Sequence, residues 1–241
     1  MDTMIFEQKR KVSSAFIDSK LQLGIHQAVL MVQDNLTECF DMMKCDGVRF
    51  RDYNAFWVFT KSSLRFLDFP KWKDEILAKT FPVSTSGFRT NVNTVLSDTS
   101  GRPLVIANQE ACVLGMENHR PVKLSTLPYP NEGFPSAAFT EPFEKFETDS
   151  PDYTLNYDYT IRSQNIDMSH HMNNIEYIKL AMNVFSDDFL QVHNAKALEV
   201  HYLNESKEGQ TLSVFSMKRN ESTFIKITES DRNVFEMKIS F

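Results

Sequence analysis

This 241-residue chain lacks several features that mark other classes of protein. It has only three cysteines and no CxxC pair, which favours reduced thiols inside the cell over a disulfide framework. Its longest aliphatic or aromatic runs, AVLMV and AFWVF, are far too short to cross a bilayer. The first residues are charged where a signal peptide requires an apolar stretch. We therefore predict a soluble, cytoplasmic protein without a membrane span.

The chain is also short of positive charge and of glycine. Its net charge of −6 argues against a nucleic-acid partner, because phosphate binding requires a basic surface. Seven glycines are too few for a doubly wound α/β fold, and the GxSxG motif of α/β-hydrolases is missing. Neither HExxH nor paired Cys/His spacing occurs, so we expect no metal and no other cofactor.

Apolar residues are abundant and recur with regular spacing. Hydrophobic residues make up 41% of the chain and 20 residues are phenylalanine, enough for a full core. Helical spacing predicts a helix over residues 24–45, and Gly47 lies just beyond it as a stop signal. We expect one strand before this helix and four after it, at residues 11–17, 55–67, 75–83, 88–97 and 103–116.

The same order of elements returns in the second half of the chain. Residues 118–150 lose periodicity and are rich in Pro, Ser and Glu, which predicts an extended linker. A strand, a helix and four further strands are predicted after it, at residues 153–161, 173–190, 197–204, 211–218, 223–230 and 233–241. A repeated unit of one long helix on an antiparallel sheet predicts an α+β fold.

Polar residues gather in the segment IDMSHHMNNIEYI, at the start of the second predicted helix. Asn173 and Glu176 have the spacing of a capping box, which gives these two residues a structural explanation. The cap does not explain Asp167, Ser169 and His171. These three alternate along an extended approach to the helix, so their side chains can share one side.

Comparison of the two copies separates these residues from a requirement of the fold. Aligning the helix starts with an offset of 146 places Leu21, Leu23 and Ile25 opposite the three polar residues. A second acidic candidate is Glu205 in YLNES, whose counterpart under an offset of 135 is Pro70. From spacing alone, a solvated turn residue is the simpler explanation of this acid. Polar groups present in one copy only predict a single active site per chain.

The start of a helix suits the chemistry of acyl transfer. Its unpaired N–H groups and the positive end of its dipole can hold a developing oxyanion. His171 suits a general base or a proton shuttle near neutral pH. The adjacent His170 is predicted to be a surface residue, Asn173 a helix cap, and Asn174 a candidate for the lining of the site.

These residues form part of a longer pattern. Asp-x-x-x-His-Met-Asn-Asn-x-x-Tyr, followed later in the chain by Tyr-x-x-Glu, resembles the acyl-acyl carrier protein thioesterases of plants and bacteria. In the first half, WVFTKSSLRFLDFPKWKDEILAKTF is similar to the family's Trp-Val, aromatic-x-x-Pro-x-Trp-x-Asp-x-Ile and Thr-aromatic run. RPVKL ends the first copy in the manner of the family. The resemblance covers almost the whole chain.

The resemblance implies a tandem double hot-dog fold and hydrolysis of a fatty acyl thioester carried by acyl carrier protein. By this resemblance, His171 is the catalytic histidine, Asp167 its orienting carboxylate, and Glu205 the acid that activates water. The chain departs from the family at Ser169, a site position where many members have Asn. It departs again at Ser206, where plant members have Cys, and this excludes a thiol nucleophile there.

We expect residues 1–125 to form an N-terminal repeat with the acyl-chain pocket, residues 126–150 a linker, and residues 151–241 the catalytic repeat. The predicted substrate-binding residues are Asn173, Asn174, Leu30 and Met31. Two alternatives stay open, namely an acyl-CoA thioesterase and a non-catalytic acyl-binding protein. The sequence also leaves open the preferred acyl chain length and the oligomeric state, a homodimer included.

Overall fold

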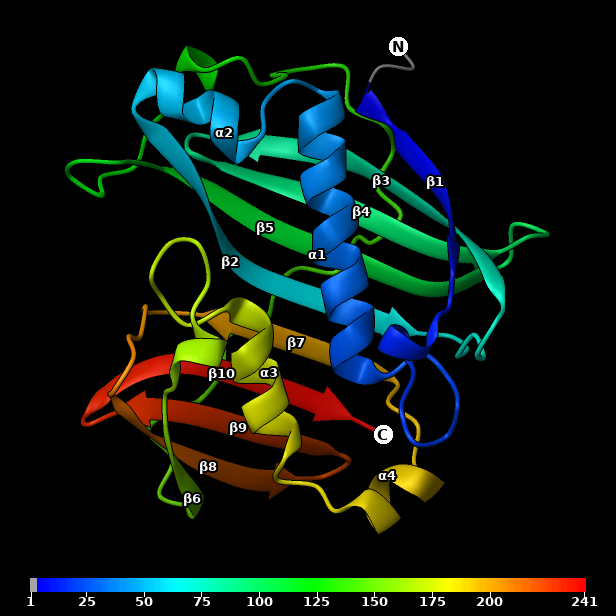
Figure 1. Cartoon of the computed structure of the whole chain (residues 1–241), viewed down its shortest axis with the longest axis vertical. Helices are drawn as coiled ribbons and strands as arrows, with labels where there is room; N and C mark the ends of the chain where they lie inside the picture. Colours follow the sequence, from blue (N-terminus) through cyan, green and yellow to red (C-terminus); the bar gives the residue numbers. More distant parts are fainter. Residues whose placement is uncertain (1–3) are drawn as a thin grey trace. The chain divides into compact units, whose positions relative to one another are not determined.

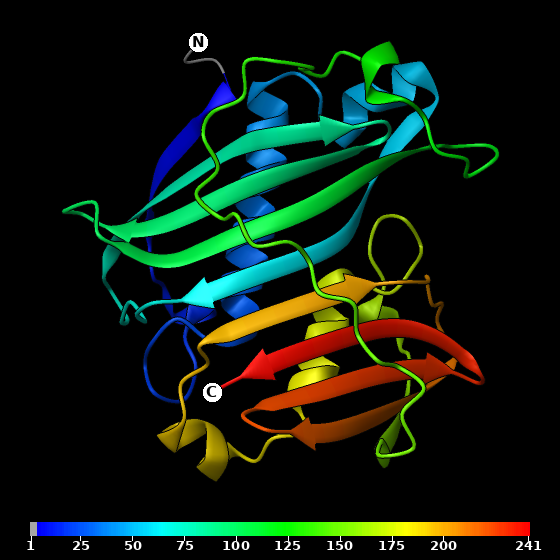
Figure 2. The same ribbon diagram turned by 180° about the vertical axis from the view of Figure 1, so that it is seen from behind.

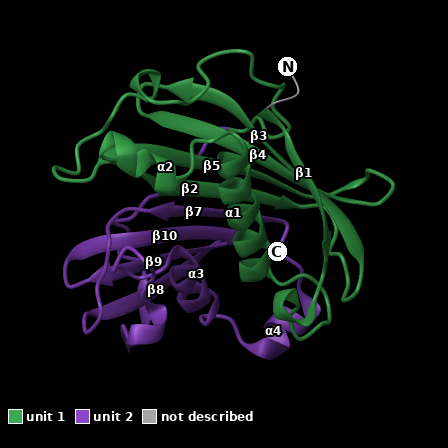
Figure 3. Cartoon of the chain, turned by 45° about the horizontal axis from the view of Figure 1, so that its top comes forward, with its two compact units in different colours: residues 1–141 green, residues 142–241 purple. Residues whose placement is uncertain are grey.

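The computed structural model describes residues 4–241 and divides into two compact units, Met1–Glu141 and Pro142–Phe241 (Figure 3). Each unit contains one antiparallel sheet with a helix on one face. Within the described residues, none of the helices combines the length and the apolar content that a membrane crossing needs.

The first unit places helix α1 (Ile25–Met42) across a five-stranded sheet (Figure 1). A short helix, α2 (Gly47–Phe50), follows it. The strands are β1 Phe6–Lys11, β2 Ala55–Phe66, β3 Glu75–Ser86, β4 Arg89–Asp98 and β5 Pro103–Gly115. In space they follow the order β1-β3-β4-β5-β2, and all neighbours are antiparallel. The buried residues of α1 recur at helical spacing, so one face of the helix covers the sheet.

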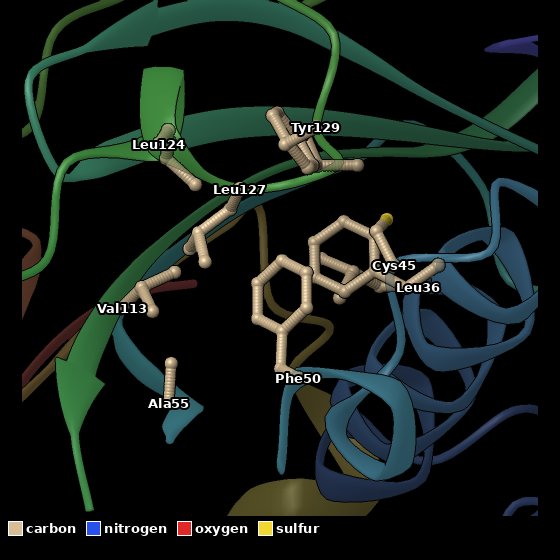
Figure 4. Packing of buried hydrophobic residues seen from close by; sticks show 10 residues of the cluster. Leu36, Cys45, Phe50, Ala55, Val113, Leu124, Leu127 and Tyr129 are labelled. Carbon is tan, nitrogen blue, oxygen red and sulfur yellow. The ribbon is translucent and has the colours of Figure 1, made fainter. Parts of the chain in front are cut away.

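An aromatic cluster fills the core of the first unit (Figure 4). Trp57 of β2 stacks on Phe40 and Phe50, with ring centroids 4.5 and 5.0 Å away. Its indole N–H donates to the carbonyl of Cys45 at 2.8 Å. Tyr129 packs into the same cluster from the segment after β5. The chain beyond the last strand is therefore part of the first core.

The second unit repeats the arrangement with a shorter helix. Its helices are α3 (Asn174–Met182) and α4 (Asp187–Val192). Its strands are β6 Thr154–Thr160, β7 Ala197–Tyr202, β8 Thr211–Arg219, β9 Ser222–Glu229 and β10 Arg232–Ser240. They follow the order β7-β10-β9-β8-β6. Helix α3 lies on one face of this sheet, where Tyr177 stacks on Phe235 of β10.

The extended chain that precedes β6 covers the opposite face of the second sheet, and Figure 2 shows it, in green, crossing β7 and β10. Phe146 of this segment stacks on His201, with ring centroids 4.3 Å apart. The backbone N–H of Glu144 donates to the carboxylate of Glu199 at 2.8 Å. Covered on both faces, β10 buries four consecutive residues, Val234–Met237.

The structure confirms the α+β fold of two tandem hot-dog repeats and corrects two predicted elements. The helix predicted at 173–190 is two helices, because α3 ends at Met182 and the side chain of Ser186 caps a new helix, α4. The strand predicted at 11–17 is also wrong. The strand lies earlier, at β1, and residues 14–16 form a 3₁₀ turn.

Candidate active site

A tight turn brings the chain to the start of α3. The backbone N–H of Asp167 donates to the carbonyl of His171 at 2.9 Å, and His170 at the tip has a φ of 63°. The carboxylate of Asp167 accepts the backbone N–H of Ser169 at 2.8 Å and its hydroxyl at 2.5 Å. Asp167 and Ser169 therefore shape the turn that presents His171.

Asn173 caps α3, as predicted, by accepting the backbone N–H of Ile175 at 2.9 Å. The predicted capping box with Glu176 does not form, because the backbone N–H of Asn173 donates to the carbonyl of Asn165 at 2.8 Å. The carboxylate of Glu176 instead accepts the amide of Asn165 at 2.8 Å and the ammonium of Lys179 at 2.6 Å. Glu176 thus ties the helix start to the preceding turn.

The structure brings His171 and Glu205 together, with 3.1 Å between Nε2 and Oε2. The side chain of His171 is 20% exposed and that of Glu205 is 47% exposed, so solvent reaches the pair mainly at Glu205. Glu205 lies in the loop after β7, and the backbone N–H of Met172 donates to the carbonyl of Ser206 in this loop at 2.8 Å. The guanidinium of Arg232 donates to the carbonyl of Glu205 at 3.1 Å.

The other predicted site residues do not join this pair by a side-chain hydrogen bond. The hydrogen bonds of the Asp167 carboxylate stay within its own turn, and Ser169 is exposed. Asn174 is the half-buried first residue of α3. Leu30 and Met31 lie on α1 in the first unit, where Leu30 is 38% exposed and Met31 is fully buried.

The first repeat contains the same turn with different side chains. Leu21 has a φ of 56° at the place of His170. The carboxylate of Asp18 accepts a backbone N–H two residues on at 2.9 Å, as that of Asp167 does. Isolated bridges occupy equivalent places in both turns, Ile17–Leu23 and Ile166–Met172. Matching residues are 149 positions apart, so the predicted offset of 146 is wrong.

This register changes what is unique to the second repeat. The counterpart of Asp167 is Asp18, so an acid at this place serves the turn in both repeats. The backbone bond between the two loops also recurs, from the Leu23 N–H to the Pro70 carbonyl at 2.8 Å. The residue opposite His171 is Gln22. Pro70 matches Ser206, so the counterpart of Glu205 is Phe69 and the predicted match to Pro70 is wrong. The imidazole and the acid beside it belong to the second repeat alone.

The arrangement supplies acid–base chemistry at a helix start. An imidazole in contact with a carboxylate can accept, pass on and donate a proton near neutral pH. The start of α3 offers the positive end of a helix dipole and the backbone N–H of Asn174, which suit an oxyanion, whereas the N–H groups of Ile175 and Glu176 are already bonded to Asn173. Across the described residues, no three His, Cys, Asp or Glu side chains are grouped to hold a metal ion.

Three residues near this pair are not among the predicted site residues. Arg232 begins the last strand, where no motif marks it. Tyr177 is 3% exposed and its only sequence signal is its place in the family pattern. Ser206 departs from the family pattern, and the structure buries it completely.

Two tandem hot-dog repeats, with a histidine–carboxylate pair at the second helix, define a double hot-dog protein equipped for acid–base chemistry. The chain belongs to the acyl-ACP thioesterase family. The model of the family's N-terminal domain matches residues 3–126, and that of its C-terminal domain matches residues 149–240. The protein is therefore a thioesterase, a hydrolase of acyl-acyl carrier protein.

Solved structures share this fold along their whole length. An acyl-ACP thioesterase from Bacteroides thetaiotaomicron superposes with a TM-score of 0.87 at 16% identity, covering 98% of this chain and 97% of that chain. The 12:0-ACP thioesterase from Umbellularia californica gives a TM-score of 0.81 at 11% identity, with coverages of 98% and 96%. None of the curated protein sequences matches the chain.

Proposed function

We propose that this thioesterase releases a free fatty acid by water attack at the start of α3, assisted by Glu205 and His171. The observation that carries the proposal is the 3.1 Å contact between the two side chains. It is supported by their absence from the equivalent turn of the first repeat, which the fold builds with Gln22 and Phe69.

In the proposed reaction, Glu205 accepts a proton from water as the water oxygen bonds to the thioester carbonyl carbon. The backbone N–H of Asn174 and the positive end of the α3 dipole hold the oxyanion that forms. The carbon–sulfur bond then breaks, and His171 delivers a proton to the departing sulfur. Glu205 passes the proton taken from water to His171 through their contact, which restores both side chains and leaves the free acid and the carrier thiol as products.

The remaining polar residues are assigned supporting roles. Asp167 and Ser169 hold the turn, and through its backbone they set the place of His171. Asn173 caps the helix, which leaves Asn174 at its first position as the proposed polar contact to the substrate. We therefore propose that Asp167 orients His171 by shaping the backbone of the turn and not by a hydrogen bond to the imidazole ring.

The acyl chain is assigned to the first repeat, for which we propose residues 1–125, with residues 126–150 as linker and residues 151–241 as the catalytic repeat. Leu30 and Met31 are the proposed lining residues on α1. Met31 is fully buried on α1, and Leu30 is partly exposed.

Release of free thiol from acyl carrier protein thioesters of graded chain length tests this function. We expect catalytic turnover, with a kcat/KM higher on the carrier protein than on the coenzyme A thioester of the same acid. An equal or higher kcat/KM on coenzyme A would favour an acyl-CoA thioesterase. Retention of one fatty acyl ligand without turnover would favour a non-catalytic binding protein.

A further inference from the structure

The hairpin between β9 and β10 holds the loop that carries Glu205. Arg232 begins β10 and donates from Nη2 to the carbonyl of Glu205 at 3.1 Å. The same nitrogen donates to the carboxylate of Glu229, the last residue of β9, at 3.4 Å. The guanidinium is thus fixed by an acid of its own hairpin and binds the backbone of the residue whose side chain contacts His171. Arg232 therefore connects the hairpin to the proposed acid–base pair.

The first repeat has an arginine at the same place in its own hairpin. Backbone hydrogen bonds from the first residue of each loop align the carbonyl of Leu104 with that of Val234. Two positions before these residues stand Arg102 and Arg232. Arg102 is also fixed by an acid of its hairpin, because its Nε donates to the carboxylate of Asp98 at 3.0 Å. An arginine held in this way is therefore a feature of the repeated fold.

The two arginines bind different acceptors in the loops. Arg102 binds a side chain, since its Nη1 and Nη2 lie 3.0 and 3.1 Å from one carboxylate oxygen of Asp68. The residue at this place in the second repeat is Asn204, whose amide donates to the carbonyl of Asn233 at 2.7 Å. Because Asn204 has no carboxylate, Arg232 binds the backbone carbonyl of the next residue instead.

We propose that Arg232 is a positioning residue, which holds the backbone of Glu205 so that its carboxylate meets His171. The inference rests on the proposed function. Asn204 leaves the guanidinium free for this bond, since an acid in its place would bind the arginine as in the first repeat. Because Arg232 binds the carbonyl, it fixes Glu205 without occupying the carboxylate that faces His171. Proton transfer depends steeply on such distances, so loss of this bond slows the reaction.

The first test compares Arg232→Met with Arg102→Met in the full chain. Each variant removes a guanidinium that joins a hairpin to a loop, and each keeps a long side chain in its place. Arg232→Met should lower kcat on acyl carrier protein thioesters at least about tenfold, with KM within about twofold of the wild type. Arg102→Met should keep kcat within about twofold. Arg232→Lys retains a charged donor and should lose less than Arg232→Met.

Two outcomes of this comparison overturn the inference. One is an equal kcat for Arg232→Met and Arg102→Met, which would give the two arginines the same structural role. The other is a rise in KM at unchanged kcat, because Arg232 would then bind the carrier protein rather than position the acid. Melting of each variant, followed by circular dichroism, checks that the compared chains are folded.

The second test transfers the acid of the first repeat into the second. Asn204→Asp supplies a carboxylate that competes for Arg232, whereas Asn204→Ala removes the amide without adding an acid. We expect kcat to be at least about fivefold lower in Asn204→Asp than in Asn204→Ala, and the difference to disappear when Arg232→Met is added to both. Equal kcat in the two single variants, or a difference that persists without the arginine, overturns the role of Asn204.

The third test does not depend on turnover. The loop of Glu205 is also bound to the chain after His171, because the backbone N–H of Met172 donates to the carbonyl of Ser206 at 2.8 Å. Exchange of the Met172 amide proton reports opening of this bond, and it should accelerate at least about fivefold in Arg232→Met but not in Arg102→Met. A lower kcat with unchanged exchange overturns a positioning role. Failure of the proposed function has a different signature, namely full turnover in His171→Ala and Glu205→Ala.

Discussion

The turns that lead into α1 and α3 have the same backbone and different side chains. Each contains an aspartate that accepts a backbone N–H two residues on, and each has a residue with positive φ at its tip. Each is also tied to a later loop by one backbone hydrogen bond. The first repeat has Gln22 and Phe69 where the second has His171 and Glu205.

This difference separates what the fold requires from what the reaction requires. Asp18 and Asp167 occur in both turns, so their common task is to build the turn. An amide and a phenyl ring cannot exchange a proton near neutral pH, whereas an imidazole and a carboxylate can. The side-chain cap of Asn173 is also specific to the second repeat. The corresponding residue at the start of α1 is Gly24, which has no side chain to cap the helix.

The largest effect is expected when the second turn receives the side chain of the first. His171→Gln keeps a polar residue of similar reach and removes the proton-carrying ring, and Glu205→Gln removes the base. Each should lower kcat by at least about 10²-fold, with little change in the free energy of unfolding. Steady-state thiol release and chemical denaturation measure the two quantities.

Gln22→His provides the matched control for this experiment. It places a histidine in the first turn, where Phe69 stands in place of the acid and the carboxylate beside position 22 is that of the turn-forming Asp18, 3.5 Å from the Gln22 amide. We expect its kcat to stay within about twofold of the wild type, and the double variant with His171→Gln to remain inactive. Recovery of activity in the double variant would show that either turn can host the reaction, against a single site per chain.

A smaller effect is expected from the aspartates that the two turns share. Asp18→Ala and Asp167→Ala should each lower the free energy of unfolding by about 1 kcal/mol, because each removes an acceptor from backbone N–H groups. Asn at either position retains an acceptor and should restore part of the loss. Equal losses in the two alanine variants support a turn-forming role. A large loss of kcat in Asp167→Asn, at unchanged stability, would instead make Asp167 part of the chemistry.

The two units also differ in the side chain that binds the segment connecting β5 to β6 along the chain. In the first unit, the amide oxygen of Asn93 accepts the backbone N–H groups of Ala138 and Phe139, both at 2.9 Å. In the second unit the acceptor is a buried carboxylate, Glu199, in contact with His201. One attachment is neutral and the other is ionisable, so a pH dependence of stability is expected in the second unit.

His201 also lies near the carboxylate of Glu236, which can report this pH dependence of stability. Burial raises its pKa, and the nearby His201 opposes the rise. A raised carboxyl pKa favours the protonated form in the folded state. The contribution to stability is therefore complete at acid pH and is lost as pH rises through the raised pKa. Relative to Glu236→Gln, the wild type should lose unfolding free energy between acid and neutral pH, and a constant difference would contradict this.

Periodicity predicted the fold because burial on one face sets both the helical and the alternating pattern. It failed where apolar residues continue after a helix has ended. Phe185 and Phe189 extend the spacing of α3, yet they stack on each other and meet Phe241 edge-on around the separate helix α4. A sequence pattern records that these half-buried rings are apolar and does not record that the backbone breaks between them.

The candidate site was predicted only in part. Spacing and the comparison of the two copies predicted His171, whereas the choice of Glu205, which lies in a separate loop, depended on the resemblance. The register of the repeat was missed because the positive-φ positions are occupied by Leu21 and His170 and not by glycine, the residue that usually marks them.

The smallest effect is expected from thiol alkylation. All three cysteines, Cys39, Cys45 and Cys112, are buried in the first repeat, and the second has Ser206 where plant relatives have a thiol. Burial raises the pKa of Cys39 to about 12 and also raises those of the other two, so little reactive thiolate forms at neutral pH. A thiol reagent should therefore leave kcat/KM unchanged, while the denatured chain reacts at all three positions. Inactivation at one cysteine, prevented by bound substrate, would instead indicate a thiol nucleophile and contradict attack by water.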